Sequence, residues 1–347
     1  MKRLFYVLTG LCLLAGVFTG CEKETEKTGT IKGVVIDEGT GNPISGVTIE
    51  LQPTGKQVKT DQYGNYTIGN LKVGTYTLKA QREGYIDYMQ EEIQVVANQT
   101  LRLNIKMNDE KKAESDYTVT ILGLNMEMVY VEGGEFKMGA TEEQGNDARA
   151  NESPVLTVKL DSYHIGKYEV TQTQWKAVMG TEPSHFKGGD FPVENVSWFE
   201  AQEFCKKLSE ATGRKYVLPT EAQWEYAARG GNKSQHFKYA GSNNINDVAW
   251  YKDYSDSQTH SVGVKNANEL GIYDMSGNVA EWCSVWLGRY DANDIDNPQG
   301  PTSGTARVAR GGGWSDVARY CRVSDRYSST PYNHSDGLGF RVVCVSE

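Results

Sequence analysis

The sequence is poor in the residues from which metal centres and nucleophilic catalytic sites are commonly built. It has five histidines and six cysteines in 347 residues. No two of them have Cys-x-x-Cys or His-x-x-x-His spacing, which argues against a zinc site of the common kinds. The histidines are also too scattered to support a Ser-His-Asp arrangement, so a structural or surface role is the better expectation for each.

Positive charge and long apolar runs are scarce as well. The chain has 36 Lys and Arg against 45 Asp and Glu, a net charge of −9, which argues against a nucleic-acid partner. The apolar run Leu4–Val17 follows Lys2 and Arg3 and is too short to span a membrane comfortably. Residues 1–20 are therefore predicted to be an export signal.

The end of this signal resembles a bacterial lipobox. It reads Phe18-Thr19-Gly20-Cys21, with Phe18 where Leu is usual, so Cys21 is predicted to be the lipidated first residue of the mature protein. The following Glu-Lys-Glu resembles the surface-export tag of Bacteroidetes lipoproteins, and residues 21–29 form a polar tether. The resemblance implies an outer-membrane lipoprotein exposed at the cell surface. The alternative is simple secretion with a free Cys21 thiol.

Residues 30–107 are predicted to form a separate β-sandwich domain. It has no His and no Cys, so nothing in it indicates chemistry. Its sequence GVVIDEGTGNPISGVTIEL resembles the carboxypeptidase regulatory-like domain, and we expect a spacer, with carbohydrate binding as an open alternative. Short segments rich in Val, Ile, Thr and Tyr are its predicted strands: Thr30–Ile36, Val47–Leu51, Asn65–Ile68, Thr75–Ala80, Glu92–Val96 and Thr100–Met107.

A charged linker, residues 108–116, leads to a second domain, residues 117–347. Its early segment MVYVEGGEFKMGA predicts a strand pair about Gly133 and Gly134. Three helices are then predicted by capping boxes that begin at Thr171, Ser197 and Thr220. The glycines that suit their ends are Gly180, Gly213 and Gly230, and the expected core faces carry Phe204, Cys205 and Leu208 on the second helix and Trp224, Ala227 and Ala228 on the third.

The most informative stretch is 307–345. Short strands are predicted at Arg307–Arg310 and Leu338–Val345, and the residues between them are small, polar or Tyr with no regular period. An irregular segment of this length in a compact domain is typical of a functional loop. A buried frame that holds an irregular polar face is the arrangement expected of a binding or catalytic surface.

Four motifs in this domain resemble the formylglycine-generating-enzyme (sulfatase-modifying factor) family. They are LPTEAQWEYAARGG, GIYDMSGNVAEW, RGGGW and GFRVV, and the resemblance covers roughly residues 128–345. It implies a relative of the C-type lectin fold, so the whole chain is predicted to be α+β, a β-sandwich followed by this domain. The family's enzymes oxidise a cysteine of a sulfatase to formylglycine with two cysteines that bind copper.

The chain departs from the family where that chemistry resides. The second enzyme cysteine matches Cys321, but the first matches Asp316, and a Trp of the GNxWEW segment is Ala280. A carboxylate is a poor substitute for a thiolate on Cu(I), so copper is not expected and oxidation that relies on Cys321 is an alternative. A structural role in the cell envelope is another alternative.

A second resemblance is to lipoproteins whose C-terminal loop is varied by diversity-generating retroelements. Fifteen positions between Ser315 and Gly337, outside an expected frame, hold none of the residues that such variation excludes: Lys, Glu, Gln, Met and Trp. The mixture resembles antibody paratopes, in which Tyr gives rigid contact area. We therefore predict ligand binding by the 315–337 loop to an unknown protein or glycan, through Asp316, Tyr320, Asp325, Tyr327, Tyr332, Asn333, His334 and Asp336. An ordinary polar loop is the alternative.

The family resemblance also implies calcium. One site would use the side chains of Asp274 and Glu281 with the carbonyls of Gly277 and Val279, because calcium prefers several oxygens at a tight bend. A plain turn with a solvated Glu281 is the alternative. A weaker second site would use Asn246, Asp247, Val248 and Asp256.

The cysteines and arginines of the second domain leave choices open. Cys205, Cys283, Cys321 and Cys344 permit three disulfide pairings, and buried thiols are also compatible with the sequence. The arginines of the last segment could bind an anion, but a role in holding loop carbonyls and carboxylates is the stronger expectation for most of them. These are Arg310, Arg319, Arg322, Arg326 and Arg341.

Overall fold

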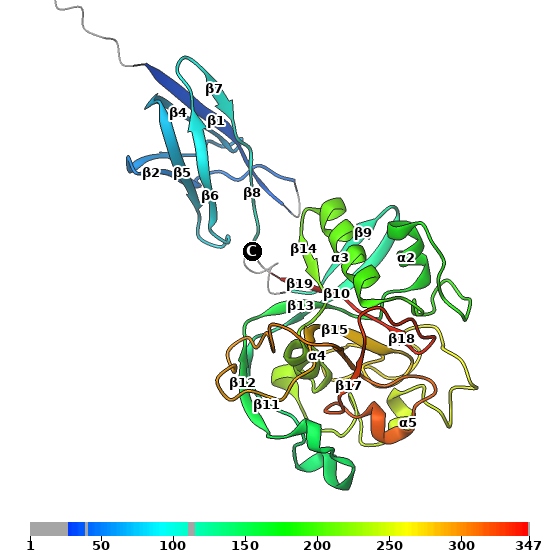
Figure 1. Ribbon diagram of the computed structural model, residues 1–347. Coiled ribbons are helices and arrows are strands. Elements are labelled where there is room, and N and C mark those ends of the chain that lie inside the picture. The colour runs from blue at the N-terminus through cyan, green and yellow to red at the C-terminus, as the bar shows by residue number, and fades with distance from the viewer. Residues whose placement is uncertain (1–26, 39–40, 110–114, 346–347) are drawn as a thin grey trace, which may run out of the picture. The chain divides into compact units, whose positions relative to one another are not determined.

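The computed structural model describes residues 27–38, 41–109 and 115–345, which fall into two compact units divided at residue 110 (Figure 1). The predicted export signal, Cys21 and most of the tether lie outside the described residues. Within the described ranges, no helix has the length and apolar character needed to cross a membrane. Each unit has its own hydrophobic core and is described by itself.

The first unit consists of two β-sheets, as predicted. One has the order β4-β1-β7, with β8 also pairing with β1, and the other has the order β3-β2-β5-β6. Alternate residues of β1 and β4 are buried, which builds the core between the sheets. The strands are β1 (Thr28–Asp37), β2 (Thr48–Gln52), β3 (Lys56–Lys59), β4 (Asn65–Lys72), β5 (Gly74–Gln81), β6 (Tyr88–Val95), β7 (Thr100–Arg102) and β8 (Ile105–Met107).

Two details of this unit differ from the prediction. The polar strand β3 was not predicted, because its sequence KQVK has almost no apolar pattern and its side chains are largely exposed. The single strand expected at Thr100–Met107 is two strands, β7 and β8, which pair in parallel with successive parts of β1.

The second unit mixes sheets and helices, so the predicted α+β class holds for the chain. Its strands are β9 (Tyr117–Ile121), β10 (Leu124–Val131), β11 (Gly134–Met138), β12 (Leu156–Leu160), β13 (Tyr163–Gly166), β14 (Lys215–Val217), β15 (Ala280–Trp286), β16 (Arg307–Arg310), β17 (Tyr327–Ser329), β18 (Leu338–Gly339) and β19 (Val343–Val345). They form sheets of order β14-β19-β13-β10-β9, β11-β12 and β17-β16-β15-β18.

Two strand predictions in this unit need correction. β10 and β11 flank Gly133, but they do not pair with each other, since β10 lies between β9 and β13 while β11 pairs with β12. The strand expected at Leu338–Val345 is interrupted, and β18 and β19 join different sheets. The interruption occurs where the Arg341 side chain turns inward to a buried partner.

The three capped helices form as predicted. They are α2 (Gln172–Met179), α3 (Trp198–Thr212) and α4 (Glu221–Ala228). Thr171, Ser197 and Thr220 each accept a hydrogen bond from the third helical residue, and Gly180, Gly213 and Gly230 are all left-handed. The expected core residues of α3 and α4 are buried. The remaining helical segments are short: α5 (Ile245–Val248), η1 (Glu142–Asp147), η2 (Ala150–Glu152), η3 (Gly231–Lys233) and η4 (Ala318–Cys321).

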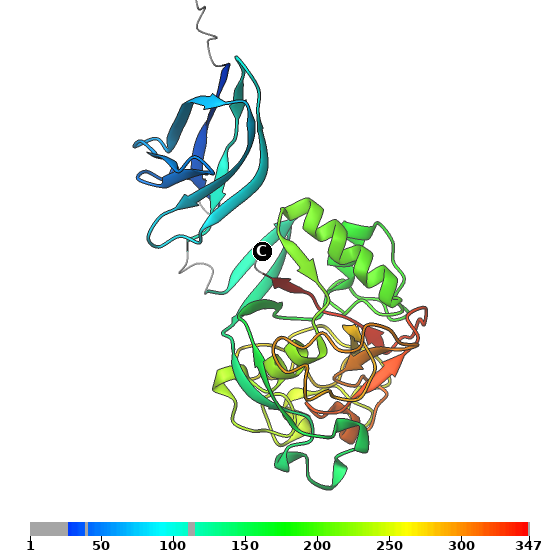
Figure 2. The same ribbon diagram turned by 60° about the vertical axis from the view of Figure 1, so that its left-hand side comes forward.

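The helices and sheets leave the last third of the chain largely irregular. Helices α2 and α3 pack on each other and on the five-stranded sheet, while α4 packs on β15 and β16 (Figures 1 and 2). The segment between β16 and β18 therefore has regular structure at both ends and only η4 and β17 in between.

Candidate functional site

The 315–337 loop is held by buried arginines that pair with carboxylates from other parts of the second unit. The Arg322 guanidinium donates to both oxygens of Glu152, at 2.6 and 2.9 Å. Arg326 donates to both oxygens of Glu221, at 2.6 and 2.7 Å. All of these side chains are buried, so the loop is anchored by paired charges rather than by regular secondary structure.

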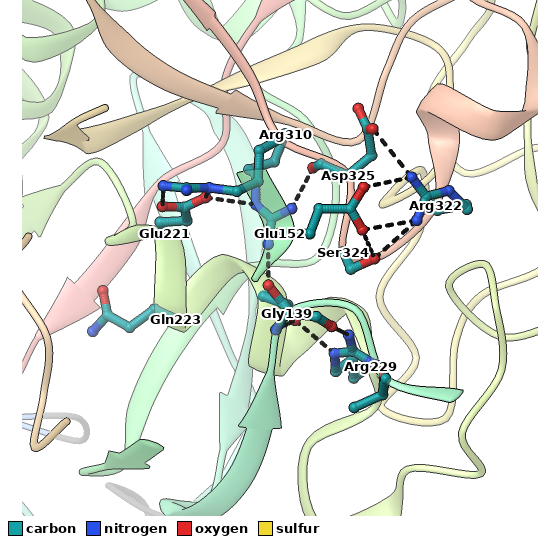
Figure 3. A network of polar contacts seen from close by, with 12 residues as sticks. Gly139, Glu152, Glu221, Gln223, Arg229, Arg310, Arg322, Ser324 and Asp325 are labelled. Carbon is teal, nitrogen blue, oxygen red and sulfur yellow. Dashed lines mark hydrogen bonds and ion pairs between the residues drawn. The ribbon is translucent and has the colours of Figure 1, made fainter. Parts of the chain in front are cut away.

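The same network continues into α4. Arg310 donates to Glu225 and to the carbonyl of Asp325, and Arg229 donates to Glu225 at 2.8 Å. Figure 3 shows Arg322 facing Glu152 and Ser324, with Arg310 reaching toward Asp325. The expectation that most arginines of this segment form a frame is confirmed.

The pKa values of these groups agree with ion pairing. Burial alone would lower the pKa of the Arg322 guanidinium, but the hydrogen bonds and charge of Glu152 outweigh burial and raise it. Burial would likewise raise the pKa of Glu152, yet Arg322 and Ser324 hold it below its ordinary value. Both partners are therefore charged at neutral pH. Removal of Arg322 would leave Glu152 as a buried, unpaired charge, and removal of Glu152 would leave Arg322 to pair with the Asp325 oxygen that also contacts Arg149.

The predicted ligand-binding residues fall into exposed and buried groups. Tyr332 is 74% exposed and Tyr327 is 50% exposed, and His334 is also exposed and contacts Glu200 at 2.8 Å. Asn333 and Asp336 are half-buried, and the carbonyl of Asp336 accepts a hydrogen bond from the Trp314 indole. Tyr327, Tyr332 and His334 are thus presented to solvent, as a binding surface requires.

Asp325 does not belong to the solvent-exposed group. Its side chain is 3% exposed, and one carboxylate oxygen lies 3.2 Å from both Arg149 and Arg322. It is a frame residue, and its assignment to the ligand surface is corrected on that ground.

Tyr320 is half-buried against two arginines. The Arg319 and Arg149 guanidinium carbons lie 4.6 and 5.4 Å from its ring centroid, and Arg319 also donates to its hydroxyl at 2.6 Å. The ring is therefore held in place by its neighbours.

The position of Cys321 does not suit a reactive thiol. Cys321 is 0% exposed and packs with Tyr239, Ile245 and Tyr251. Burial raises the pKa of its thiol well above the ordinary value, and the nearby carboxylates of Asp316 and Asp325 raise it further. Reactive cysteines are partly exposed and have lowered pKa values, so Cys321 has the properties of a structural thiol.

Asp316, which replaces the first enzyme cysteine, is committed to its own turn. Its carboxylate accepts a hydrogen bond from the Gly313 N–H at 2.9 Å, and its carbonyl accepts one from Lys252. Burial raises the pKa of the Asp316 carboxyl. The four described cysteines, Cys205, Cys283, Cys321 and Cys344, are buried and form no disulfide with one another, so none of the three possible pairings is present among the described residues.

Of the residues predicted to bind calcium at the Gly277 bend, Glu281 is engaged in a buried ion pair. Both oxygens of Glu281 accept hydrogen bonds from Arg341, at 2.6 and 2.7 Å, and one also accepts the Trp224 N–H. Asp274 accepts the Gly263 N–H, and burial raises the pKa of its carboxyl to about 6. Glu281 is therefore a buried ion-pair residue rather than a solvated one, while one oxygen of Asp274 is buried without a hydrogen-bond partner.

Two of the residues predicted for the second calcium site, Asn246 and Asp247, also have hydrogen-bond partners within the protein. The side-chain oxygen of Asn246 accepts the Tyr251 hydroxyl, and its carbonyl accepts the Lys265 ammonium at 2.9 Å. The Asp247 carboxylate accepts hydrogen bonds from Ser242 and Asn244. Across the described residues, no group of three or more His, Cys, Asp or Glu side chains is placed to hold a metal.

Sequence reasoning missed the residues that hold the loop from a distance. Arg149, just before η2, contacts Asp325, and Glu152, in η2, contacts Arg322. Both contacts join residues that are more than 160 positions apart in the sequence. Their polar segment has no apolar period, so nothing in it could have predicted the contact. Phe199 was also missed, although its exposed ring lies 4.9 Å from the ring of Tyr332.

Two domain families and several known proteins are similar to this chain. The model of the sulfatase-modifying factor enzyme 1-like domain matches residues 120–345, and that of the carboxypeptidase regulatory-like domain matches residues 30–108. A protein named chaperone protein LppX from Paenibacillus barcinonensis is 37% identical over 248 residues, covering 57% of this chain and 82% of that protein.

An enzyme and a solved structure are also similar to the second unit. The formylglycine-generating enzyme of Streptomyces coelicolor is 29% identical over 283 residues, covering 61% of this chain and 87% of the enzyme. The structure described as Treponema denticola variable protein 1 has a TM-score of 0.61 and 33% identity, covering 66% of this chain and 98% of that one.

Proposed function

Because the chain belongs to the family of sulfatase-modifying factor enzyme 1-like domains, we propose that its second unit is a non-catalytic, ligand-binding member of that family. The observation that carries the proposal is the state of the two copper-ligand positions. One holds Asp316, and the other holds a cysteine that is 0% exposed and whose thiol pKa is raised by burial. These two positions therefore cannot supply the two thiolates that would bind one Cu(I) ion.

The binding surface in this proposal is the exposed part of the 315–337 loop, with Tyr327, Tyr332 and His334 as its leading contacts. A rigid frame of ion pairs fixes the loop backbone, which lowers the entropy lost when a partner binds. Exposed Tyr rings on a fixed backbone are suited to protein recognition, because they supply large contact areas with few rotatable bonds. The similarity to a structure described as a variable protein agrees with a surface that tolerates sequence change.

The absence of catalysis is tested by measuring both Cu(I) binding and the oxidation of a substrate peptide. Purified protein is titrated with Cu(I) against a chromophoric chelator, and a cysteine-containing sulfatase peptide is then incubated with it and weighed by mass spectrometry. We expect no stoichiometric Cu(I) and no formylglycine. Stoichiometric copper, with peptide oxidation that disappears in Cys321→Ser, would instead establish the oxidase.

We also propose that the protein is a surface-exposed outer-membrane lipoprotein anchored at Cys21, with the first unit as a spacer. Support comes from the short apolar leader and the small residues before Cys21. Cells given a palmitate analogue are expected to label the wild-type protein and not Cys21→Ala. Equal labelling and equal membrane retention of the two proteins would exclude the anchor.

A further inference from the structure

Arg307, the first residue of β16, lies flat between two tryptophans. Its guanidinium carbon is 3.5 Å from the ring centroid of Trp286 and 3.9 Å from that of Trp198. Trp286 ends β15 and Trp198 begins α3, so three elements converge on one cation. A guanidinium covered on both faces retains only its edge for hydrogen bonds.

The edge of this guanidinium is largely unused. One Nη donates to the Ser284 carbonyl at 2.6 Å, and the Nε is buried without a hydrogen-bond partner. The Arg307 side chain is half-buried, so a docking carboxylate would meet its Nη atoms. Arg310, Arg322, Arg326 and Arg341 each pair with a carboxylate, whereas none of the described residues forms an ion pair with Arg307.

The pKa of Arg307 is shifted in the opposite direction from the pKa values of the four paired arginines. In the four paired arginines, carboxylates outweigh burial and raise the pKa. At Arg307 burial lowers the pKa, and no acidic neighbour counteracts it. A carboxylate that docked at the Arg307 edge would therefore supply the charge that the fold supplies to the other four.

An exposed aromatic row continues from this stack toward the 315–337 loop. Trp198 meets Phe199 edge-on at 5.3 Å between ring centroids, and Phe199 meets Tyr332 at 4.9 Å. Phe199 is 44% exposed. The backbone N–H of Trp198 donates to the Pro331 carbonyl, which ties this row to the loop backbone.

We propose that the row formed by Trp286, Arg307, Trp198, Phe199 and Tyr332 binds a carboxylate-bearing segment of a protein partner. The partner's carboxylate pairs with the Arg307 edge, and its neighbouring apolar side chains pack on Phe199 and Tyr332. A protein is favoured because Trp, Tyr and Arg are the residues that carry most binding energy in protein interfaces. The inference rests on the proposed binding function of the loop and names the chemistry of its partner.

The test uses an acetylated hexaglutamate peptide as the probe, with hexaglutamine and a hexagalacturonate as comparison compounds. The full mature chain is labelled with ¹⁵N, and the indole N–H signals of Trp198 and Trp286 are assigned with Trp→Phe variants. We expect hexaglutamate to shift both signals and hexaglutamine to shift neither. Arg307→Gln is expected to weaken hexaglutamate binding at least about tenfold, the change that corresponds to about 1.4 kcal/mol.

Arg214→Gln is the matched control, because Arg214 also lies against an aromatic ring, 4.5 Å from the Tyr117 centroid, but is outside the 315–337 loop. Its affinity for hexaglutamate is expected to equal that of the wild type. If Arg307→Gln has an altered melting temperature, the double variant Phe199→Ala/Tyr332→Ala replaces it, and the same weakening is expected there.

The inference would be overturned if hexaglutamate bound the wild type, Arg307→Gln and Phe199→Ala/Tyr332→Ala with equal affinity, or if it did not bind the wild type. It would also be overturned if hexagalacturonate alone shifted the indole signals, which would assign the row to acidic glycans. Such a failure remains distinct from failure of the proposed function. Binding of another partner that is lost in Tyr327→Ala/Tyr332→Ala would keep the loop as a ligand surface while removing Arg307 from it.

Discussion

At the scale of single residues, the second unit depends on ion pairs that are closed to solvent. Arg322 and Glu152 are both buried, and neither has an alternative partner of opposite charge that could fully replace the other. Removal of one member of a buried pair typically destabilises a protein by about 3–5 kcal/mol, because the remaining charge is stranded.

Glu152→Ala is therefore expected to lower the free energy of unfolding by about 3–5 kcal/mol. Chemical denaturation followed by fluorescence measures the change. Arg289→Ala is the control, since that exposed arginine should alter stability by no more than about 0.5 kcal/mol. Equal stability of Glu152→Ala and the control would show that the pair does not hold the loop.

A buried carboxyl beside the loop should make stability depend on pH. Burial raises the pKa of Glu194 from 4.5 to about 7, and one of its oxygens has no hydrogen-bond partner. The folded state then holds this proton more tightly than the unfolded state. The stabilisation is complete below about pH 4.5 and is lost as the pH rises to about 7.

Glu194→Gln tests this effect, because its side chain keeps a similar shape but does not titrate. The difference in unfolding free energy between variant and wild type should change in the variant's favour from pH 4.5 to 7. Other buried acids are common to both proteins and cancel. A difference that is constant across this range would mean that Glu194 titrates normally.

The Glu281–Arg341 pair gives a prediction about metal removal. Since Arg341 occupies both oxygens of Glu281, a calcium chelator should leave the melting temperature of the second unit unchanged. Glu281→Gln should lower that temperature equally with and without added calcium. A chelator effect that disappears in Glu281→Gln would restore the calcium site that the family resemblance implies.

At the scale of elements, helix ends were the most predictable feature. Ser197 caps α3 through its hydroxyl, and Glu200 returns a hydrogen bond to the Ser197 N–H at 2.8 Å. These contacts are local, so residues three apart in the sequence suffice to predict them. Gly180 and Gly213 were predictable for the same reason, because a left-handed residue after a helix favours glycine.

Ser197→Ala should cost about 1 kcal/mol of stability, the usual effect of losing a cap. Thermal unfolding of the variant measures this, with Ser303→Ala, an exposed loop position, as the matched control. Because α3 also positions Trp198 against the loop, the variant should broaden the Trp198 indole signal as well. A variant as stable as the control would show that the cap is redundant.

The loop's interior was less predictable from the sequence. Asp325 and Tyr327 are both polar-loop residue types, yet one is buried between arginines and the other is half exposed. What separates them is a contact with Arg149, which is 176 residues away in the chain. Such pairings depend on the complete fold, so composition could predict an irregular polar loop but not which of its side chains point outward.

At the scale of the whole molecule, the chain joins a β-sandwich with its own core to a family domain with its own cores. Both domain types were predictable, because several motifs and a run of short strands carry that information. The chemical environment of Cys321 was not, since it depends on the burial of the thiol rather than on the presence of the residue. We infer that this enzyme-family domain binds a partner through its exposed loop without catalysis.

The most direct test of that claim is binding of the mature chain to an array of glycans and extracellular proteins. We predict at least one bound component whose signal is lost in Tyr327→Ala/Tyr332→Ala, because an aromatic hot spot contributes about 2 kcal/mol, or about 30-fold in Kd. Tyr63→Ala, at a 64% exposed site of the first unit, should bind as the wild type does. Signals identical in all three proteins at every bound component would contradict the account.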